Sequence, residues 1–503
     1  MADTAHDALL QRVYRINDIS RALSVLSWDR EVNMPKAGDK ARVQQMTTLR
    51  QLLHQYATSD DLGEAIEAAA AELTGLPDDD DRGCLIRVLR RDYGRSRKLP
   101  EAFVLDLSRV GAEAWRTWKQ AREDDDFASF QPHLARLIEL QQEMAEFYGY
   151  ETDPYDALLD GYEEGAKTAQ VAKVFAAVKA ETVPLLQAIV DRGRNIDDRL
   201  LHQAFPVASQ EAFARHIGEV VGYDFARGHL GTAVHPFATS FDRDDARITT
   251  RWYPDFLSPS LFGTLHECGH AMYEQGVAPE LSRTPLGRGG SSGIHESQSR
   301  MIENLVGRSR DFWRAHFPSL QAAFPQQLGQ TDAESFYGAI NKVQPSLIRV
   351  EADELTYNLH IILRFELEQA MLGGDLAAAD LPGAWRDGMQ RLLGVTPPDD
   401  RDGCLQDVHW SGASFGYFPT YALGNLHAAQ MYEAALAADP AIGSQLAAGR
   451  TDALLDWLRR NVHRHGRKFP PDQLIQRATG RPLDHRAFVR YVTSKFGDLY
   501  GLA

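Results

Sequence analysis

Apolar residues at helical spacing dominate this sequence and set the strongest limit on its fold. In residues 131–148 they recur at intervals of three, four and seven, which is typical of one face of an amphipathic helix. The stripe consists of Leu134, Leu137, Ile138, Met144 and Phe147. Pro132 suits the first position of this helix. Similar stripes lie at residues 9–26, 171–190, 355–371 and 453–462. The pattern predicts a mainly α-helical protein.

One region departs from this helical pattern. Residues 232–237 and 246–252 are rich in β-branched and aromatic side chains and flank a polar turn at 242–245. This arrangement predicts a short hairpin or a small sheet. Pro236 has no N–H to donate to a strand ladder, so it favours an edge or a bulge.

The chain has 503 residues, without an internal repeat or a low-complexity linker. Its candidate chemical residues span 235–421, which is too wide for a small catalytic module. We therefore expect one large domain over residues 1–503. A formal net charge of −16 argues against nucleic acid or an anionic membrane as a partner.

The sequence indicates a reducing compartment. Residues 1–10 have neither a basic nor an apolar segment of the kind found in secretory signals. No stretch approaches the roughly 18 uninterrupted apolar residues of a membrane span. Three scattered cysteines are too few for a disulfide framework. These observations predict a cytoplasmic protein.

The segment His266-Glu267-Cys268-Gly269-His270 carries the clearest chemical signal. Ser258 and Pro259 predict a helix start, as N-cap and first residue, and Gly276 predicts its end. Histidines at i and i+4 of a helix project from one face and can bind one zinc ion. Glu267 is turned by about 100°, which suits a general base rather than a ligand. Cys268 points away and is read as a packing residue.

A catalytic zinc site needs a third protein ligand. Residues 295–304 follow a Gly/Ser-rich loop and predict a second helix. Glu296 lies 26 residues after His270, and Glu303 lies seven residues further on the same helical face. Spacing leaves the choice between these two carboxylates open, although either is favoured over His295.

With these segments and several others, the sequence resembles the carboxypeptidase Taq family of zinc metallocarboxypeptidases over almost its whole length. The matching segments are Ser27-Trp28-Asp29-Arg30-Glu31 with Met34-Pro35, His235-Pro236-Phe237 (HPF), Asp245-Ala246-Arg247-Ile248-Thr249 (DxRxT), His295-Glu296-Ser297-Gln298, Ile348-Arg349-Val350-Glu351-Ala352-Asp353 (IRxxAD), and residues 403–410 (GxxQDxHW).

The resemblance implies that His266, His270 and Glu296 bind the metal and that Glu267 is the base. It implies a mainly helical, gluzincin-like domain with a deep substrate groove, covered by an N-terminal part of about 1–225 and completed by a catalytic part of about 226–503. It also implies a homodimer that removes single residues from peptide C-termini with broad specificity. Zinc is the expected metal, and cobalt often substitutes.

The remaining site residues are expectations from chemistry. A peptidase stabilises a developing oxyanion, and Tyr421 and His409 are candidates for this donor; the alternative is an ordinary buried aromatic residue and a satisfied histidine. An exopeptidase binds a terminal carboxylate, for which a bidentate arginine is suited. Arg349 is the first choice and Arg247 the second. His235 either orients the substrate or closes the hairpin.

Two other functions fit part of this sequence pattern. A zinc oligoendopeptidase uses a similar histidine pair, but it lacks a carboxylate-binding arginine or leaves its groove open at both ends. A catalytically silent helical scaffold that binds peptides is expected to have lost a ligand or the base. The IRxxAD and GxxQDxHW segments and the intact Glu267 favour the carboxypeptidase with free C-terminal carboxylates as its substrates.

Overall fold

The computed structural model describes residues 4–502, which form two compact units. Unit 1 contains the N-terminal part up to Arg97, together with Asp197–Ile340 and Met431–Pro482. Unit 2 contains Lys98–Ile196, Asn341–Gln430 and the C-terminal part from Leu483. Each unit is thus built from segments far apart in the sequence. That the whole chain acts as one domain stays a prediction.

Unit 1 combines helices with the sheet. Its helices are α1 (Ala5–Val32), α2 (Asp39–Thr58), α3 (Asp60–Glu72), α4 (Asp81–Lys98), α9 (Val207–Val221), α10 (Leu257–Gly276), α11 (Ser292–Arg300), α12 (Arg310–Ala323), α13 (Pro325–Leu328), α14 (Ala333–Ile340), α18 (Pro440–Ala447), α19 (Asp452–Asn461) and α20 (Pro471–Thr479). A π-helical segment, η5 (Met301–Val306), continues α11. The strands are β1 (Leu230–Thr232), β2 (Ala238–Asp242) and β3 (Asp245–Thr250).

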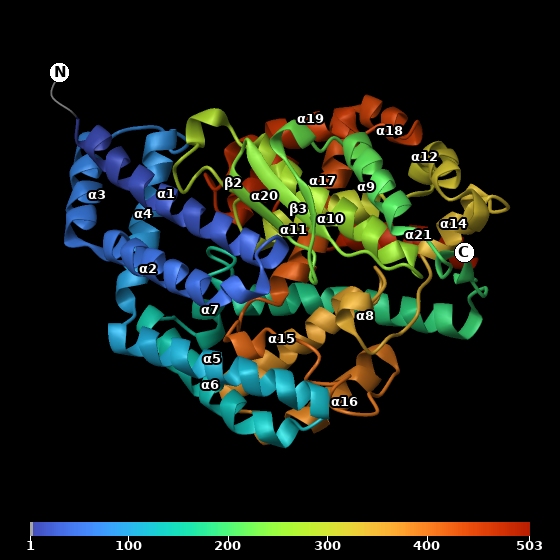
Figure 1. Cartoon of the computed structure of the whole chain (residues 1–503), viewed down its shortest axis with the longest axis horizontal. Helices are drawn as coiled ribbons and strands as arrows, with labels where there is room; N and C mark the ends of the chain where they lie inside the picture. Colours follow the sequence, from blue (N-terminus) through green and yellow to red (C-terminus); the bar gives the residue numbers. More distant parts are fainter. Residues whose placement is uncertain (1–3, 503) are drawn as a thin grey trace. The chain divides into compact units, whose positions relative to one another are not determined.

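Helix α10 lies at the centre of unit 1. It packs against β2 and β3 on one side and contacts α9, α11 and η5 elsewhere (Figure 1). Fourteen of its twenty residues are buried, so water is kept from most of its surface. A separate apolar cluster joins α1, α3 and α4, with Leu9, Val13, Ile66 and Val88 at most 2% exposed. The sheet, α9, α11 and η5 fix α10 in place.

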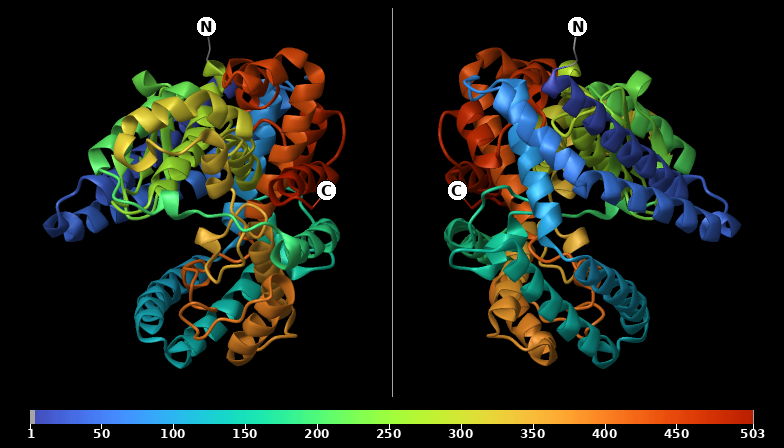
Figure 2. Two further views of the ribbon diagram at one scale, coloured as in Figure 1. Left: turned by 90° about the vertical axis from the view of Figure 1, so that its right-hand side faces the viewer. Right: turned by 90° about the vertical axis from the view of Figure 1, so that its left-hand side faces the viewer.

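Unit 2 is helical among its described residues. Its helices are α5 (Glu101–Asp124), α6 (Phe127–Tyr148), α7 (Pro154–Leu159), α8 (Thr168–Arg192), α15 (Tyr357–Gly373), α16 (Leu381–Leu393) and α21 (Arg486–Tyr500). Helix α17 (Pro419–Ala438) belongs to unit 2 up to Gln430 and to unit 1 beyond it. Figure 2 shows α5 and α6 side by side, and α15 packs against α6 and α16. None of the described helices is long and apolar enough to cross a membrane.

The predicted fold class, mainly α with a small sheet, is confirmed, and a helix overlaps each of the five apolar stripes to within two residues. Pro132 was wrongly placed, however, because α6 begins at Phe127 and encloses it. The start of α10 was also shifted, because its N-cap is Phe256 and not Ser258. Pro259 is still tolerated there, since the first-turn N–H groups of a helix have no intrahelical acceptor.

The sheet has the order β1-β3-β2, with β1 parallel and β2 antiparallel to β3. The predicted turn at 242–245 is present between β2 and β3. The first predicted strand, 232–237, was wrong, because β1 ends at Thr232 and β2 begins only at Ala238. Pro236 falls in the connection between them, where the missing N–H breaks no ladder.

Candidate metal centre

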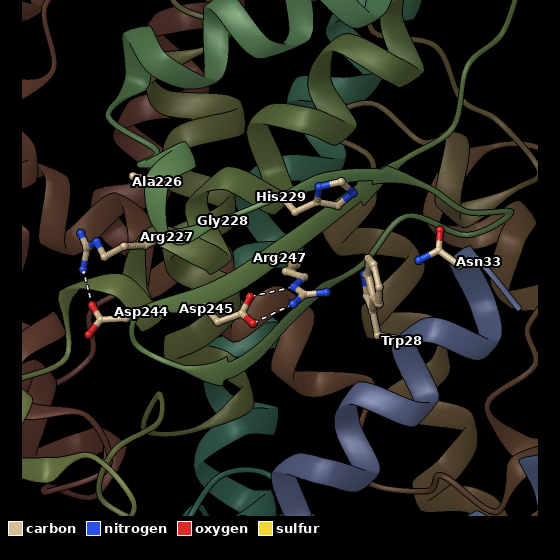
Figure 3. Close-up of a pocket in the computed structure, with 9 residues that line it drawn as sticks. All are labelled: Trp28, Asn33, Ala226, Arg227, Gly228, His229, Asp244, Asp245 and Arg247. Atoms are coloured by element: carbon tan, nitrogen blue, oxygen red, sulfur yellow. Dashed lines mark hydrogen bonds and ion pairs between the residues drawn. The ribbon is translucent and has the colours of Figure 1, made fainter.

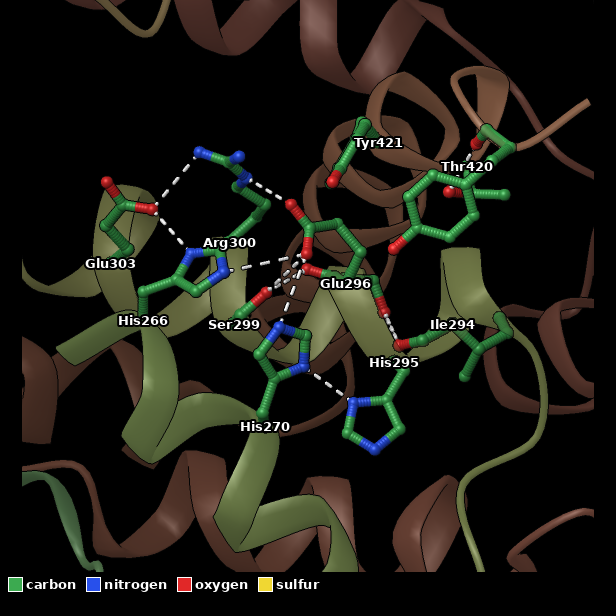
Figure 4. A network of polar contacts seen from close by, with 12 residues as sticks. His266, His270, Ile294, His295, Glu296, Ser299, Arg300, Glu303, Thr420 and Tyr421 are labelled. Atoms are coloured by element: carbon green, nitrogen blue, oxygen red, sulfur yellow. Dashed lines mark hydrogen bonds and ion pairs between the residues drawn. The ribbon is translucent and has the colours of Figure 1, made fainter. Parts of the chain in front are cut away.

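Helix α10 presents both histidines of the sequence motif on one face. His266 and His270 are one turn apart, and their ring centroids are 4.9 Å from each other at an angle of 78°. Their Nε2 atoms face the carboxylate of Glu296, which α11 contributes (Figure 4). The three residues form a group whose ligand atoms all lie within 4.8 Å of one another.

The spacing of this group fits a zinc ion. Glu296 Oε2 is 3.6 Å from His266 Nε2 and 3.4 Å from His270 Nε2. Ligand atoms at 2.0–2.1 Å from a tetrahedral zinc lie roughly 3.3 Å apart, which is close to both of these distances. Two imidazoles and one carboxylate are also ligands that zinc accepts, with a fourth position left for water or substrate.

A glycine allows α10 and α11 to approach closely enough. A Cβ atom added to Gly269 would lie 2.4 Å from the carbonyl oxygen of Gln298 and 2.6 Å from Cα of Ser299. Both atoms are backbone atoms of α11, so they cannot rotate away. Gly269 therefore sets the distance between the helix that carries the histidines and the helix that carries Glu296.

Glu296 is held in its charged form. It is 5% exposed, and its Oε1 accepts a 2.7 Å hydrogen bond from Arg300 Nε. Ser299 Oγ lies 3.2 Å from the other oxygen. Burial opposes ionisation, but Arg300 and His266 outweigh it and hold the pKa of Glu296 well below its usual range. A ligand carboxylate is therefore ready to bind a cation near neutral pH.

Glu303 occupies a different place. Its Oε2 lies 2.9 Å from Nδ1 of His266, on the side of the ring away from Nε2, and it accepts a hydrogen bond from Arg300 (Figure 4). Burial is outweighed mainly by Arg300 and His266, so the pKa of Glu303 is lowered to about 2. Between the two carboxylates that spacing left open, the structure thus brings Glu296 into the convergent group and Glu303 behind His266.

Glu267 and Cys268 are both buried on α10. Glu267 is 6% exposed, and burial raises its pKa to about 7. A carboxylate of this basicity is a stronger proton acceptor at neutral pH than an exposed one. Cys268 is fully buried, and its Sγ lies close to Gly218 of α9. This position agrees with a packing residue.

Residues 8–496 match the family described as Carboxypeptidase Taq (M32) metallopeptidase. The chain belongs to this family. It is 42% identical to thermostable carboxypeptidase 1 of Thermus thermophilus over 490 residues, which cover 95% of each chain. It is 38% identical to carboxypeptidase 1 of Bacillus subtilis, with 97% of each covered. A solved M32 carboxypeptidase from Deinococcus radiodurans superposes with a TM-score of 0.95, at 39% identity and 99% coverage of both chains.

The protein is therefore a metallocarboxypeptidase of the M32 family, and its predicted substrate residues can be placed. His235 is exposed in the connection between β1 and β2. Arg247 of β3 lines a pocket of about 460 Å³ in unit 1 (Figure 3). Its guanidinium binds both oxygens of Asp245 at 2.7 and 2.8 Å and stacks over the rings of Trp28 and Phe241.

In unit 2, the IRxxAD and GxxQDxHW segments of this metallocarboxypeptidase meet. Arg349 Nε and Nη2 donate to Oδ1 of Asp407 at 3.0 and 2.6 Å, and Nη1 lies 3.1 Å from the hydroxyl of Tyr357. Arg364 Nε donates to the other Asp407 oxygen at 2.6 Å. Burial is outweighed by the two arginines, which hold the pKa of Asp407 far below its usual range.

The two candidate oxyanion donors are also together in unit 2. His409 Nε2 is 3.3 Å from the hydroxyl of Tyr421. Burial lowers the pKa of His409 to about 4, against the opposing effect of Asp407. The ring is therefore neutral near pH 7 and can form a hydrogen bond with the Tyr421 hydroxyl.

Several residues that contact the predicted residues within their own unit were not predicted themselves. They are Arg300, Glu274, Asp407 and Arg364. Asp407 lies inside the GxxQDxHW segment, and the rule that a buried arginine needs a partner could have drawn attention to it. Glu274 follows His270 by one helical turn and so continues the face of the two histidines. Arg300 and Arg364 carry no comparable signal in the sequence.

Proposed function

We propose that this M32 metallocarboxypeptidase uses zinc held by His266, His270 and Glu296, with Glu267 as its general base, to release single residues from peptide C-termini with broad specificity. The observation that carries the proposal is the convergence of three ligand atoms next to a buried carboxylate of raised basicity. Cobalt, which accepts the same ligands, is proposed as a substitute.

When bound, zinc supplies a Lewis acid that polarises a peptide carbonyl and makes water nucleophilic near neutral pH. Glu267 then accepts a proton from the attacking water as the new C–O bond forms. The same carboxyl group delivers that proton to the leaving nitrogen as the C–N bond breaks. His266 and His270 would hold the ion through their Nε2 atoms, both of which face Glu296 Oε2.

The substrate-binding roles follow from hydrogen-bond geometry. The bonds of Arg349 to Asp407 and Tyr357 use three of its five N–H donors. One donor on each of Nη1 and Nη2 remains, and a carboxylate can accept hydrogen bonds from these donors. We assign Arg349 to the terminal carboxylate, with Arg247 as second choice, and Tyr421 with His409 to the oxyanion. His235 is assigned to orienting the substrate.

We also propose that the protein is a homodimer in the cytoplasm. A homodimer is expected from the family resemblance, and light scattering on the purified protein tests it. The free, buried state of Cys84, Cys268 and Cys404 supports a reducing, cytoplasmic compartment. Recovery of the native protein from a cytoplasmic fraction with these thiols reduced is the corresponding measurement.

Metal content and turnover separate the roles of the acidic residues. Glu267→Gln should keep about one zinc per chain while kcat falls roughly 10²- to 10⁴-fold, because only the proton acceptor is lost. Glu296→Ala should lose the metal at a chelator concentration that wild type resists, and Glu303→Ala should lose less. The measurement is elemental analysis after dialysis, together with peptide hydrolysis.

Loss of zinc from Glu267→Gln would contradict its assignment as base. A greater loss from Glu303→Ala than from Glu296→Ala would mean that the third ligand is wrongly assigned.

A further inference from the structure

His295, the residue before Glu296, connects the second histidine of α10 to a buried carboxylate. Its Nδ1 lies 2.6 Å from Nδ1 of His270, and its Nε2 lies 2.9 Å from Oε1 of Glu274 (Figure 4 shows the first of these contacts). Glu274 is on α10, one turn after His270, and is 8% exposed. The three side chains therefore form a line from the candidate metal position to Glu274.

The direction of each hydrogen bond in this line follows from Glu274. An ionised carboxylate only accepts hydrogen bonds, and Oε1 also receives the backbone N–H of Gly289 at 2.9 Å. Burial opposes ionisation, but the contact with His295 outweighs it and lowers the pKa of Glu274 to about 2. His295 must therefore carry its proton on Nε2.

In the tautomer that carries its only proton on Nε2, the His295 ring has a lone pair on Nδ1. That lone pair accepts the Nδ1 proton of His270, which leaves the lone pair of His270 on Nε2. Nε2 is the atom that faces Glu296 Oε2 at 3.4 Å. In the opposite arrangement His295 donates to His270, whose proton then sits on Nε2 and blocks a metal bond.

The loop before α11 is built around this pair. A Cβ atom added to Gly289 would lie 2.4 Å from Cδ2 of His295 and 3.0 Å from Cε1 of Tyr273, so only glycine fits there. The Tyr273 hydroxyl accepts the N–H of Gly290 at 3.0 Å. The amides of Gly289 and Gly290 thus hold the loop against Glu274 and Tyr273. The loop therefore packs against the ring of His295.

The first histidine is supported differently. His266 Nδ1 contacts Glu303 directly at 2.9 Å, without an intervening ring. The two histidines of one motif are thus oriented by two carboxylates, one by direct contact and one through an imidazole. Partners of this kind fix the ring orientation and basicity of a metal-binding histidine.

We propose that Glu274 and His295 are positioning residues, which hold His270 in the tautomer protonated on Nδ1 and aim its Nε2 at the metal. The inference rests on the proposed metal site of the preceding section. It predicts that metal affinity depends on the acceptor at His295 Nδ1 and on the acceptor oxygen of Glu274, although neither residue touches the cation.

The test measures zinc affinity of the full chain by chelator competition, and the visible spectrum of the cobalt form. His295→Phe keeps a planar ring but removes both nitrogens, so zinc affinity should fall about 10- to 100-fold and the cobalt bands should change. His463→Phe is the matched control. His463 is buried beside Tyr273, and its Nε2 contacts Gln298 Oε1 at 2.9 Å rather than an atom of the line from His270 to Glu274. It should lose thermal stability while its zinc affinity stays at the wild-type value.

A second pair keeps the test decisive if His295→Phe does not fold. Glu274→Gln retains an oxygen that can accept from both His295 and Gly289, and its zinc affinity should stay near that of wild type. Glu274→Leu should lose affinity as His295→Phe does. Wild-type zinc affinity in His295→Phe or Glu274→Leu overturns the inference alone. Failure of the wild-type chain to bind zinc through His266 and Glu296 overturns the proposed function instead.

Discussion

Arg349 and Arg247 are the two candidate ligands for a substrate carboxylate, and each already binds an aspartate of this chain. Arg349 bonds Asp407 through its side edge, and Arg247 bonds both oxygens of Asp245 in the same manner. Both are stacked over aromatic rings, Arg247 over two and Arg349 over three, but Arg349 is only 5% exposed whereas Arg247 is half-buried. At the residue scale, the question is which of the two guanidinium groups binds the substrate carboxylate with its remaining N–H donors.

Substitution by lysine answers this question, because lysine keeps the charge but loses the planar fork. Arg349→Lys should lower kcat/KM for peptides with a free C-terminus about 10- to 100-fold, the worth of one charged hydrogen bond. Arg247→Lys serves as the parallel variant and should have the smaller effect. Steady-state kinetics with a thermal melt of each variant is the measurement. The reverse order would assign the carboxylate to Arg247.

Which residues can be predicted depends on how locally their geometry is fixed. His266, Glu267 and His270 lie within five residues of one helix, so helical geometry alone sets their relation. Spacing alone left the choice between Glu296 and Glu303 open, although the family resemblance implied Glu296. The packing of α11 on α10 brings Glu296 into one group with the two histidines. The pair Arg349–Asp407 spans 58 residues, and no local rule brings such residues together.

At the element scale, the contact between α10 and α11 determines the metal geometry. Gly269→Ala places a Cβ atom 2.4 Å from the backbone of α11. The resulting shift of α11 should move Glu296, reduce zinc affinity at least tenfold, and lower the free energy of unfolding by about 1–3 kcal/mol. Chelator competition and denaturant unfolding measure the two effects.

Gly263→Ala on the same helix is the control. Its added Cβ meets only Thr250 Oγ1 at 3.6 Å, an ordinary contact. Alanine in a helix interior is favoured over glycine by up to about 1 kcal/mol, so this variant should bind zinc normally and be at least as stable. Equal zinc affinity in the two variants would contradict the role given to Gly269.

The elements themselves were largely predictable, because apolar stripes of period 3.6 reflect burial of one helix face. Boundaries were less so. Pro132 lies inside α6, and strand β2 begins after the HPF segment rather than before it. The π-helical turn of η5, which carries Glu303, had no signal in the sequence. Such turns are often found at functional sites and depend on tertiary contacts.

At the scale of the whole molecule, buried ion pairs tie stability to pH. Asp407 is 6% exposed and its pKa is held below the usual value by Arg349 and Arg364. A carboxyl group of lowered pKa stabilises the fold above its unfolded value of about 3.9, and this contribution is lost as pH falls below that value. Asp407→Asn removes the charge at every pH.

Asp407→Asn should therefore cost about 3–5 kcal/mol at pH 7, because two buried guanidinium groups lose their counter-charge. The difference from wild type should shrink as the pH falls below about 4. Denaturant unfolding across this range is the measurement. Asp61→Asn, at an exposed pair with Arg12, should change the free energy of unfolding far less, because water screens that pair. A pH-independent difference for Asp407→Asn would argue against this linkage.

The central claim concerns the whole chain, which is similar to carboxypeptidases over 95% or more of its length. The most direct test is a mass-spectrometric time course on one peptide and its C-terminally amidated twin, with zinc or cobalt and a chelator control. We expect stepwise loss of single C-terminal residues from the free acid only, stopped by the chelator. Internal cleavage of both peptides would indicate an endopeptidase, and cleavage of neither would indicate a silent scaffold; either result would contradict the account.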